Sequence, residues 1–347
     1  MLKKARTVYD IAREAGVSPA TVSRVLTGSA NVSAQKKERV QSVIQKYNYK
    51  PNAIARSLIK EESKMIGLIL PDITNPFFAE LFQQMENYTL RLGYSILLCN
   101  AMNDNYANIT NLESFYLKTL VEQHVDGIVL MGGRVNESKT NRAHAQEVVE
   151  VMDHVPVVMI NGRMTGVDCY RVVSDERDGL FQAIDYLYNL GHRKIGFIGG
   201  MKGITSTDIK LRAFQSRVKE YGMTCEKGWV IPGTYSVGSG FDAMNQLLNS
   251  HELPTAVLAV NDSVAAGALK AAQKRGVSVP GDISIVGFDG TYITDIVTPE
   301  LTTVRHDYES IARAAIDDIV QKSDRTGARR ELLLKSKLLI KESCAPL

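Results

Sequence analysis

The stretch GVSPATVSRVL, residues 16–26, carries a proline inside a segment that otherwise has the composition of a helix. Gly16 readily adopts the left-handed conformation that ends a preceding helix. Ser18 can cap a second helix, and Pro19 then occupies the first helical position, where its missing N–H costs nothing. We therefore predict that the proline begins a helix and that Gly16 lies in a turn between two helices.

The residues before this turn predict the first of the two helices. Thr7 can cap a helix that begins at Val8, and Asp10 follows three residues after Thr7, as in a capping box. The apolar residues of VYDIAREA then recur on one face. The spacing to Gly16 is typical of a helix-turn-helix. The residues expected in its small core are Ala12, Val22, Val25 and Leu26.

The outer face of the second helix has the residue types that a DNA-binding helix needs. Short side chains at a helix N-terminus can enter the major groove, and Arg24 can donate two hydrogen bonds to guanine O6 and N7. An ordinary helical hairpin with a solvated face would give the same pattern. However, residues 1–62 contain 12 Lys and Arg against 5 Asp and Glu, a net charge of +7, whereas the remainder carries −4. This asymmetry favours contact between the N-terminal segment and a polyanion. The outer face comprises Pro19, Ala20, Thr21, Ser23 and Arg24.

A third helix is predicted after Ser33, which can cap it. It should end within 48–52, because Lys50 precedes a proline and is therefore driven out of helical geometry. The next segment, NAIARSLIKEE at 52–62, is too short for a stable isolated helix and should order only against a second copy or DNA. The inner face of the third helix is expected to contain Val40, Val43, Ile44 and Tyr47.

From residue 63 onward, short apolar runs alternate with helical patterns. Each run is continuously apolar over six or seven residues, as expected of a strand that is buried on both faces. Strands that alternate with helices predict parallel α/β sheets, here arranged as two doubly wound lobes. The runs are 65–70, 94–100, 126–132, 155–161, 194–200, 255–261 and 283–289, and helices are expected over 76–92 and 263–275.

Three motifs, TVYDIAREAGVSPATVSRVL (7–26), NVS (31–33) and NYKPNAIARSL (48–58), together with this α/β body, resemble the LacI/GalR family of bacterial transcription regulators. The resemblance covers nearly the whole chain. It implies a helix-turn-helix domain at 1–50, a hinge helix at 51–62 and a core at 63–347 with the fold of periplasmic sugar-binding proteins. In this fold the chain crosses between the lobes three times. The N-terminal lobe would comprise about 63–172 and 305–335, and the C-terminal lobe about 173–304 and 336–347.

The same resemblance implies how the N-terminal segment contacts DNA. Two hinge helices of a homodimer would pair in the minor groove at the centre of a palindromic operator, and Leu58 would wedge into the central base step. The residues expected to contact DNA are Thr7, Ser18, Pro19, Ala20, Thr21, Ser23, Arg24, Asn31, Asn52, Ala55 and Leu58.

Polar residues just beyond the apolar runs are candidates for a small-molecule site, since ligands of such sheets lie at the carboxyl ends of the strands. Helix capping is the alternative role, and it is favoured for Asn75 and Asp262. Strand ends supply Asp72, Asn75, Asn161, Arg163, Asn261, Asp262 and Asp289. The resemblance adds further pocket positions and implies that a small, sugar-like effector contacts Asp72, Phe77, Phe78, Asn161, Lys210, Tyr235, Asn261, Asp289 and His306.

Three of these positions depart from the family pattern. His306 stands where many relatives have Gln, Lys210 where sugar-responding relatives usually have Arg, and Asn161 where Asp is frequent. We expect Lys210 in the first turn of a helix capped by Ser206 or Thr207. Its charge would favour a phosphorylated or carboxylated sugar. A solvated surface lysine, or a register in which Arg212 is the ligand-binding residue instead, are the alternatives.

Other functional classes lack support in the sequence. No apolar run is long enough to span a membrane, and no signal peptide begins the chain, so a cytoplasmic protein is expected. The common nucleotide-binding, metalloprotease and hydrolase motifs are absent, which predicts no enzymatic activity, metal or cofactor. A solute-binding protein of a transport system would share the core but not the basic N-terminal segment. We expect a repressor of carbohydrate-utilisation genes, and the sequence leaves open a protein co-effector.

Overall fold

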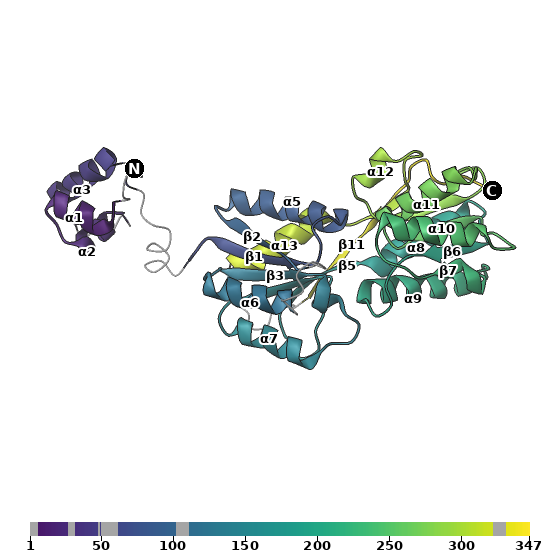
Figure 1. Ribbon diagram of the computed structural model, residues 1–347, viewed down its shortest axis with the longest axis horizontal. Helices are drawn as coiled ribbons and strands as arrows, with labels where there is room; N and C mark the ends of the chain where they lie inside the picture. The colour runs from purple at the N-terminus through teal and green to yellow at the C-terminus, as the bar shows by residue number, and fades with distance from the viewer. Residues whose placement is uncertain (1–5, 27–31, 48, 50–61, 102–110, 322–330) are drawn as a thin grey trace. The chain divides into compact units, whose positions relative to one another are not determined.

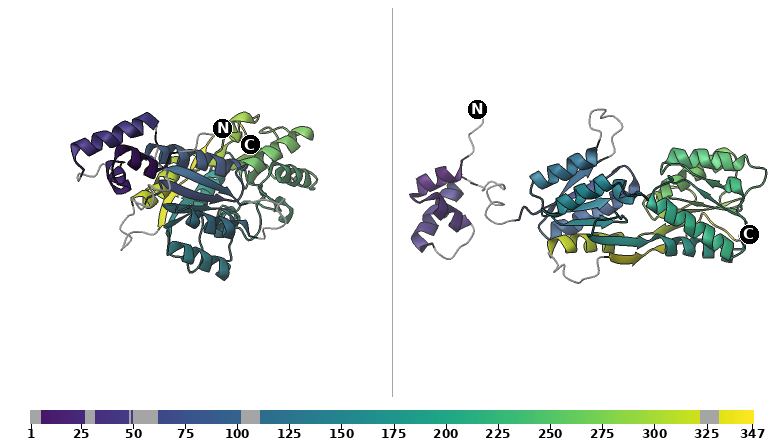
Figure 2. Two further views of the ribbon diagram at one scale, coloured as in Figure 1. Left: turned by 60° about the vertical axis from the view of Figure 1, so that its left-hand side comes forward. Right: turned by 90° about the horizontal axis from the view of Figure 1, so that it is seen from below.

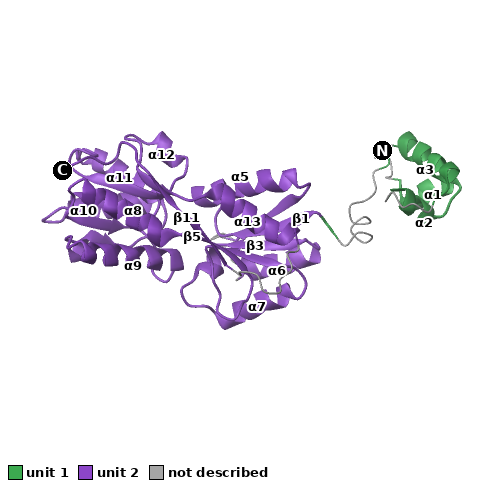
Figure 3. Ribbon diagram, turned by 180° about the vertical axis from the view of Figure 1, so that it is seen from behind, with its two compact units in different colours: residues 1–63 green, residues 64–347 purple. Residues whose placement is uncertain are grey.

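The computed structural model describes residues 6–26, 32–47, 49, 62–101, 111–321 and 331–347. The chain forms two compact units, Met1–Ser63 and Lys64–Leu347 (Figure 3). The described residues of the first unit form three helices and their connections, and the second unit consists of two α/β lobes (Figure 1).

The helical unit begins with the predicted pair of helices. Helix α1 (Val8–Ala15) carries the expected capping box: the Thr7 side chain accepts from the Asp10 N–H, and the Asp10 carboxylate accepts from the Thr7 N–H at 2.9 Å. Gly16 ends the helix with φ of 65°. Helix α2 (Pro19–Leu26) starts at the proline, and the Thr21 N–H donates to Ser18 Oγ at 3.2 Å. The prediction that Pro19 begins a helix is therefore confirmed.

Helix α3 (Ala34–Tyr47) completes this unit and closes its core. Val22 is fully buried against residues of all three helices, as the helix-turn-helix spacing predicted. The buried side chains are Ile11, Ala12, Ala15, Val22, Val40 and Val43, with Val25, Leu26, Ile44 and Tyr47 partly buried around them. The expected hinge helix at 51–62 falls almost entirely outside the described residues.

The first lobe of the α/β unit contains a six-stranded parallel sheet in the order β11-β5-β4-β3-β1-β2. One hydrophobic core joins the sheet to α5 and α13, and a second joins its other face to α6 and α7. The elements are β1 (Met65–Leu70), α5 (Pro76–Arg91), β2 (Ser95–Asn100), α6 (Leu112–Glu122), β3 (Gly127–Met131), the 3-10 turn η1 (Gly133–Asn136), α7 (Arg142–Met152), β4 (Val157–Ile160), β5 (Tyr170–Asp175), α13 (Tyr308–Val320) and β11 (Glu331–Lys335).

The second lobe repeats this architecture with the order β12-β10-β9-β8-β6-β7, in which β12 is antiparallel to β10. Helix α8 packs with α9, and α10 packs with α11. The elements are α8 (Glu176–Asn189), β6 (Ile195–Ile198), α9 (Thr205–Glu220), η2 (Lys227–Trp229), β7 (Val230–Ile231), α10 (Val237–Leu248), β8 (Ala256–Ala259), α11 (Asp262–Lys274), β9 (Ser284–Asp289), α12 (Ile293–Ile296), β10 (Thr303–Arg305) and β12 (Lys337–Leu339).

Helices α10 and α11 approach each other unusually closely. A Cβ atom added at Gly240 would lie 2.0 Å from the carbonyl oxygen of Val264, and one at Gly267 would lie 2.0 Å from that of Val237. Only glycine therefore fits at these two crossing points. The close contact fixes the N-termini of both helices, where several side chains of the site described below are attached.

The chain passes between the lobes three times, through segments that run alongside one another (Figure 2). It leaves the first lobe after β5, returns between β10 and α13, and leaves again at Ser336. The first two crossings come slightly later than the expected boundaries near 172 and 305. The reason is that β5 stays paired to β11 as far as Asp175, and β10 stays paired to β9 as far as Arg305.

All seven apolar runs form strands, but the expectation that each is buried on both faces was wrong for one of them. Strand β2 is not buried on both faces, because it is an edge strand on which Leu97 is 37% exposed. The sequence patterns also missed β5, β7, β10, β11 and β12. These strands are short or contain charged and polar residues, so they lack a continuous apolar run of six or seven residues.

Candidate ligand cavity and nucleic-acid interface

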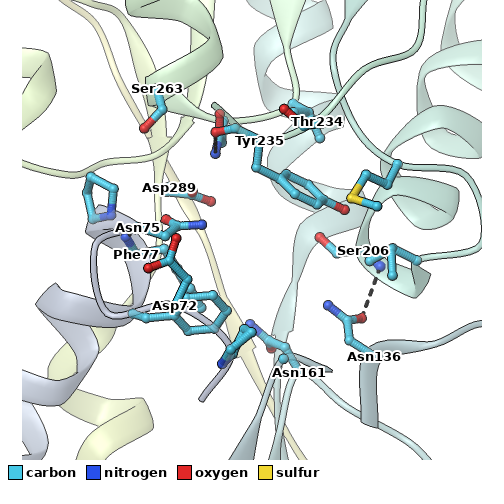
Figure 4. A pocket seen from close by; sticks show the side chains of 18 of the residues that line it. Asp72, Asn75, Phe77, Asn136, Asn161, Ser206, Thr234, Tyr235, Ser263 and Asp289 are labelled. Atoms are coloured by element: carbon cyan, nitrogen blue, oxygen red, sulfur yellow. Dashed lines mark hydrogen bonds between the residues drawn. The ribbon is translucent and has the colours of Figure 1, made fainter. Parts of the chain in front are cut away.

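A cavity of about 660 Å³ lies between the two lobes, at the carboxyl ends of their strands. This volume is within the range of small-molecule sites. Figure 4 shows side chains converging on it from both lobes. The labelled residues of the first lobe are Asp72, Asn75, Phe77, Asn136 and Asn161, and those of the second are Ser206, Thr234, Tyr235, Ser263 and Asp289.

The first lobe presents side chains that are fixed by local hydrogen bonds. Asp72 follows β1, and its Oδ1 accepts from the N–H and hydroxyl of Thr74 at 2.9 and 2.7 Å. Asn75 caps α5, as the alternative role predicted, and it also lines the cavity. Asn161 follows β4 with φ of 48°, and its Oδ1 accepts from the Ser174 N–H at 2.7 Å. This strained backbone conformation is held in place by the bond to the neighbouring strand.

The second lobe contributes the ends of α10 and α11. Asn261 Oδ1 accepts from the Val264 N–H at 2.9 Å, and its Nδ2 donates to the Tyr235 carbonyl at 3.1 Å. Asn261 is thus the cap of α11, a role that we had favoured for Asp262. The Asp262 carboxylate is buried and accepts instead from Thr291 and Thr303, away from the cavity lining.

Lys210 lies at the centre of a buried charge cluster. Its Nζ is 3.4 Å from Glu176 Oε1 and 3.9 Å from Asp289 Oδ1, and it donates to the Val260 carbonyl at 3.1 Å. It also lies 3.8 Å from the centre of the Phe288 ring. Burial alone disfavours the ammonium, but the charges of Glu176 and Asp289 outweigh it and raise the pKa of Lys210 above its ordinary value.

Our expectations for the local structure around Lys210 were wrong. Helix α9 begins at Thr205, so Lys210 lies in its second turn, and neither Ser206 nor Thr207 caps it. The Ser206 hydroxyl donates to Glu176 Oε1 at 2.6 Å instead. Lys210 is 3% exposed, which rules out a solvated surface lysine, whereas Arg212 is exposed and does not line the cavity.

His306 and Asp289 form a second buried pair at the return crossing between the lobes. His306 Nε2 lies 3.3 Å from Asp289 Oδ1, and no partner within the described residues reaches His306 Nδ1. The imidazole is surrounded by the rings of Phe77, Phe288 and Tyr308, with centroids 5.2, 5.4 and 5.8 Å away. Asp289 has φ of 107°, an unfavourable value for a non-glycine residue. This conformation lets a residue at the end of a buried strand line the cavity.

The structure brings all nine predicted effector residues to this one cavity. Arg163, a further strand-end candidate, is not among the residues that line it. Sequence reasoning missed Glu176, which begins a helix after the undetected strand β5. It also missed Asn136 and Ser206, which connect the lobes by a hydrogen bond from the Ser206 N–H to Asn136 Oδ1 at 3.3 Å (Figure 4). Glu176, Asn136 and Ser206 follow none of the seven apolar runs directly, so the sequence did not mark them as site residues.

Within the described residues, no group of three or more His, Cys, Asp or Glu is placed to hold a metal ion. The same part of the chain contains no helix that is both long and apolar enough to cross a membrane.

The helical unit presents the predicted DNA-facing residues on its surface. On α2, Ala20 and Arg24 are exposed, while Pro19, Thr21 and Ser23 are half-buried. Thr7 and Ser18 are exposed at the beginnings of α1 and α2, where they serve as caps. The remaining residues expected to contact DNA, Asn31, Asn52, Ala55 and Leu58, lie outside the described residues.

Comparison with known families matches each unit separately. Residues 7–52 match the model described as bacterial regulatory proteins, lacI family. Residues 184–344 match the model of the periplasmic binding protein-like domain.

Similar proteins of known sequence and structure cover nearly the whole chain. Catabolite control protein A of Priestia megaterium is 34% identical over 299 residues, 86% of each chain. The transcriptional regulator DegA of Bacillus subtilis is 32% identical over 98% of each chain. The PurR repressor of Haemophilus influenzae strain PittEE is 32% identical over 91% of this chain and 90% of its own.

Two solved structures extend this similarity to the fold. The lac repressor dimer bound to operator and the anti-inducer ONPF superposes with a TM-score of 0.83 at 25% identity, over 99% of this chain and 100% of that one. The transcriptional regulator CelR in complex with cellobiose gives a TM-score of 0.69 at 26% identity, over 97% and 99%. The helix-turn-helix, the two-lobed core and these relatives agree: the chain belongs to the lacI family of bacterial DNA-binding transcriptional regulators.

Proposed function

We propose that this protein is a homodimeric transcriptional repressor whose affinity for a palindromic operator is set by a small, sugar-like effector in the interlobe cavity. The observation that carries this proposal is the combination of an N-terminal helix-turn-helix with a two-lobed core that encloses a cavity lined by both apolar and polar side chains. The effector would bind one arrangement of the lobes more tightly than the other and so shift the DNA-binding equilibrium. The solved lac repressor dimer, a relative in fold, supports the homodimer.

The helical unit supports DNA recognition by α2. Its N-terminal side chains are short, so the helix can approach the floor of a major groove, and Arg24 is exposed one turn further on. The net charge of +7 on residues 1–62 would supply the attraction to phosphate groups that underlies all DNA binding. A solute-binding protein of a transport system shares the two lobes but gives no role to this unit, so we favour the regulator.

The lining of the cavity supports a sugar or sugar derivative as the effector. Amide and carboxylate groups on both lobes can bind the hydroxyl groups of a polyol, and Phe77 and Tyr235 can pack against the faces of a ring. Solved relatives described as complexes with cellobiose and with bound ribose are consistent with such a ligand. Such an effector would make this protein a repressor of carbohydrate-utilisation genes.

The proposal is tested with the full chain in two stages. Selection from a random DNA pool first identifies the operator, and fluorescence anisotropy then gives the operator affinity at one fixed salt concentration. A panel of neutral sugars, sugar phosphates and purine bases is then added to the protein–operator complex. We expect a sugar or sugar derivative to change the operator affinity by a factor within the range of about 5–150 that is typical of allosteric coupling.

Asp289→Ala tests whether the effector binds in the cavity, and Asp153→Ala is its matched control. A lost hydrogen bond to a charged group weakens binding by about 1.5–3 kcal/mol, so the effector response should shift at least tenfold in concentration while operator affinity without effector persists. The exposed Asp153→Ala should respond like the wild type. If no sequence is selected, the DNA-binding proposal fails. If Asp289→Ala responds at the wild-type concentration, the effector binds elsewhere.

A further inference from the structure

We infer that Glu176 determines the charge of the ligand that the cavity accepts: by pairing with Lys210 it neutralises the cavity's ammonium group, so that anionic ligands are excluded. This inference rests on the proposed role of the cavity as the effector site. It reverses the sequence-based expectation that Lys210 would favour a phosphorylated or carboxylated sugar.

Lys210 and Glu176 form a close, buried pair. Glu176 Oε1 lies 3.4 Å from Lys210 Nζ, and the two side chains are 7% and 4% exposed. The same oxygen accepts a hydrogen bond from the Ser206 hydroxyl at 2.6 Å, which holds the carboxylate in place. The ammonium group of Lys210 is therefore already paired with the carboxylate of Glu176 when no ligand is bound. An anionic ligand would have to compete with this carboxylate.

The cavity lining as a whole carries more carboxylates than cationic groups. Among the described residues that line the cavity, Lys210 is the only ammonium or guanidinium group, whereas Asp72, Glu176 and Asp289 are carboxylates. An anion that reached Lys210 would lie close to acidic groups in a site of low dielectric, where repulsion is strong. A hydroxyl group carries no such penalty and can bind both partners of the Lys210–Glu176 pair.

Glu176 is assigned this role in preference to Asp289, although both face the ammonium. Asp289 Oδ1 is 3.9 Å from Lys210 Nζ and lies closer, at 3.3 Å, to His306 Nε2, whereas the other partner of Glu176 Oε1 is the Ser206 hydroxyl group. Glu176 begins α8 directly after the first crossing between the lobes, and its contact with Lys210 is shorter. Removal of the Glu176 charge should therefore release Lys210 for an external anion.

The test measures the thermal stabilisation of the full chain by inorganic phosphate, at constant ionic strength and with chloride as the reference anion. Glu176→Gln removes the charge but retains an oxygen that accepts from Ser206. We expect phosphate to stabilise Glu176→Gln at concentrations at least about tenfold lower than the wild type requires. Glu176→Gln with Lys210→Met should lose this response, since the anion-binding group is then absent.

Glu252→Gln is the matched control. It makes the same chemical change at a carboxylate that pairs with Lys194 at 3.1 Å in the same lobe, outside the cavity, and should behave as the wild type. Equal phosphate responses of Glu176→Gln and wild type would overturn the inference, as would a response that survives Lys210→Met in the double variant. Should Glu176→Gln fail to fold, a phosphate response of the wild type that Lys210→Met abolishes overturns it as well.

The phosphate measurement needs no operator and no identified effector. Its failure would leave the DNA-binding assay unaffected, and failure of the DNA-binding assay would leave the phosphate result standing. The two outcomes are therefore distinguishable.

Discussion

The outer face of α2 and the interlobe cavity use polar residues in opposite ways. On α2, Ala20 and Arg24 project from the surface of a helix whose position is fixed by apolar packing beneath it. In the cavity, Lys210, Glu176 and His306 are 3%, 6% and 2% exposed. Lys210 pairs with Glu176, and His306 pairs with Asp289. The side chains on the outer face of α2 are therefore positioned by the apolar core beneath the helix. Those of the cavity are positioned by polar contacts with neighbouring side chains.

This difference predicts which substitutions damage the fold and which damage only binding. A buried charge that loses its partner is left in surroundings that solvate it poorly. The free energy of unfolding therefore falls. When an exposed side chain is removed, water takes its place, so the free energy of unfolding changes little. Stability and ligand recognition should therefore be coupled in the cavity but separable on α2.

The largest effect is expected for Lys210→Met, which leaves the carboxylates of Glu176 and Asp289 buried together without a cation. Breaking such a pair from one side costs about 3–5 kcal/mol in the free energy of unfolding. This loss is measured by urea unfolding, followed by the fluorescence of Trp229. Trp229 is the single tryptophan of the chain and is buried in the lobe that contains the cluster.

Lys194→Met is the control for this prediction, because it removes the same charge from an exposed pair with Glu252. A surface pair contributes about 0–1 kcal/mol, so this variant should unfold almost as the wild type does. The double variant Lys210→Met with Glu176→Gln should recover part of the loss. Equal stabilities of Lys210→Met and Lys194→Met would show that the cluster is not the structural element proposed here.

The helical unit could be predicted from sequence almost completely, because its signals are local. The capping box of Thr7 and Asp10, the left-handed Gly16 and the first-turn Pro19 each act within four residues. The apolar spacing then fixes which faces meet. Contacts between distant segments, such as the pair of Glu14 with Lys46, add to these local signals within the described residues.

The cavity could be predicted only in part. Strand-end position and family resemblance pointed to the nine residues that converge on it, since parallel strands place their carboxyl ends together. Their partners were not predictable, because the Lys210–Glu176 and Asp289–His306 pairs join residues far apart in sequence. Sequence reasoning therefore led to Lys210 as a residue of the cavity lining, but it did not foresee the pairing of Lys210 with Glu176.

A smaller effect is expected when the apolar support beneath α2 is weakened. Val22 is fully buried in a core of six buried side chains, and Val22→Ala removes two methyl groups, which should destabilise the helical unit by about 2 kcal/mol. Hydrogen exchange of peptides from 7–26 should show faster opening, while peptides from the α/β unit remain unchanged. The exposed Ala20→Ser should leave both unchanged; equal opening in the two variants would contradict the packing assigned to Val22.

Arg24→Ala should separate binding from stability. The loss of a bidentate contact to guanine weakens operator binding by about 1–3 kcal/mol and relaxes specificity at one base pair. Because Arg24 is exposed, hydrogen exchange of 7–26 should stay within about 0.5 kcal/mol of the wild type. Operator and random DNA are compared at one salt concentration. An equal loss of affinity on both would place Arg24 on phosphate alone.

The smallest effect concerns the acid sensitivity of α1. Hydrogen bonds from the Thr7 N–H and hydroxyl lower the pKa of Asp10 below its ordinary value of 3.8. The folded state therefore binds this proton less readily than the unfolded state does. It follows that the capping box contributes stability above pH 3.8, and that this contribution is lost as the pH falls through the lower, folded pKa.

In Asp10→Asn no carboxylate is left to titrate, so opening of peptides from 7–15 should become less dependent on pH in this acidic window. Thr7→Val removes the hydroxyl but keeps the backbone N–H, and it should lessen the dependence without abolishing it. The assay is hydrogen exchange of the full chain on both sides of pH 3.8, with peptides of α3 as the internal reference. Wild type and Asp10→Asn with the same acid dependence would mean that the charge of Asp10, unlike those of the cavity, plays no part in holding its helix.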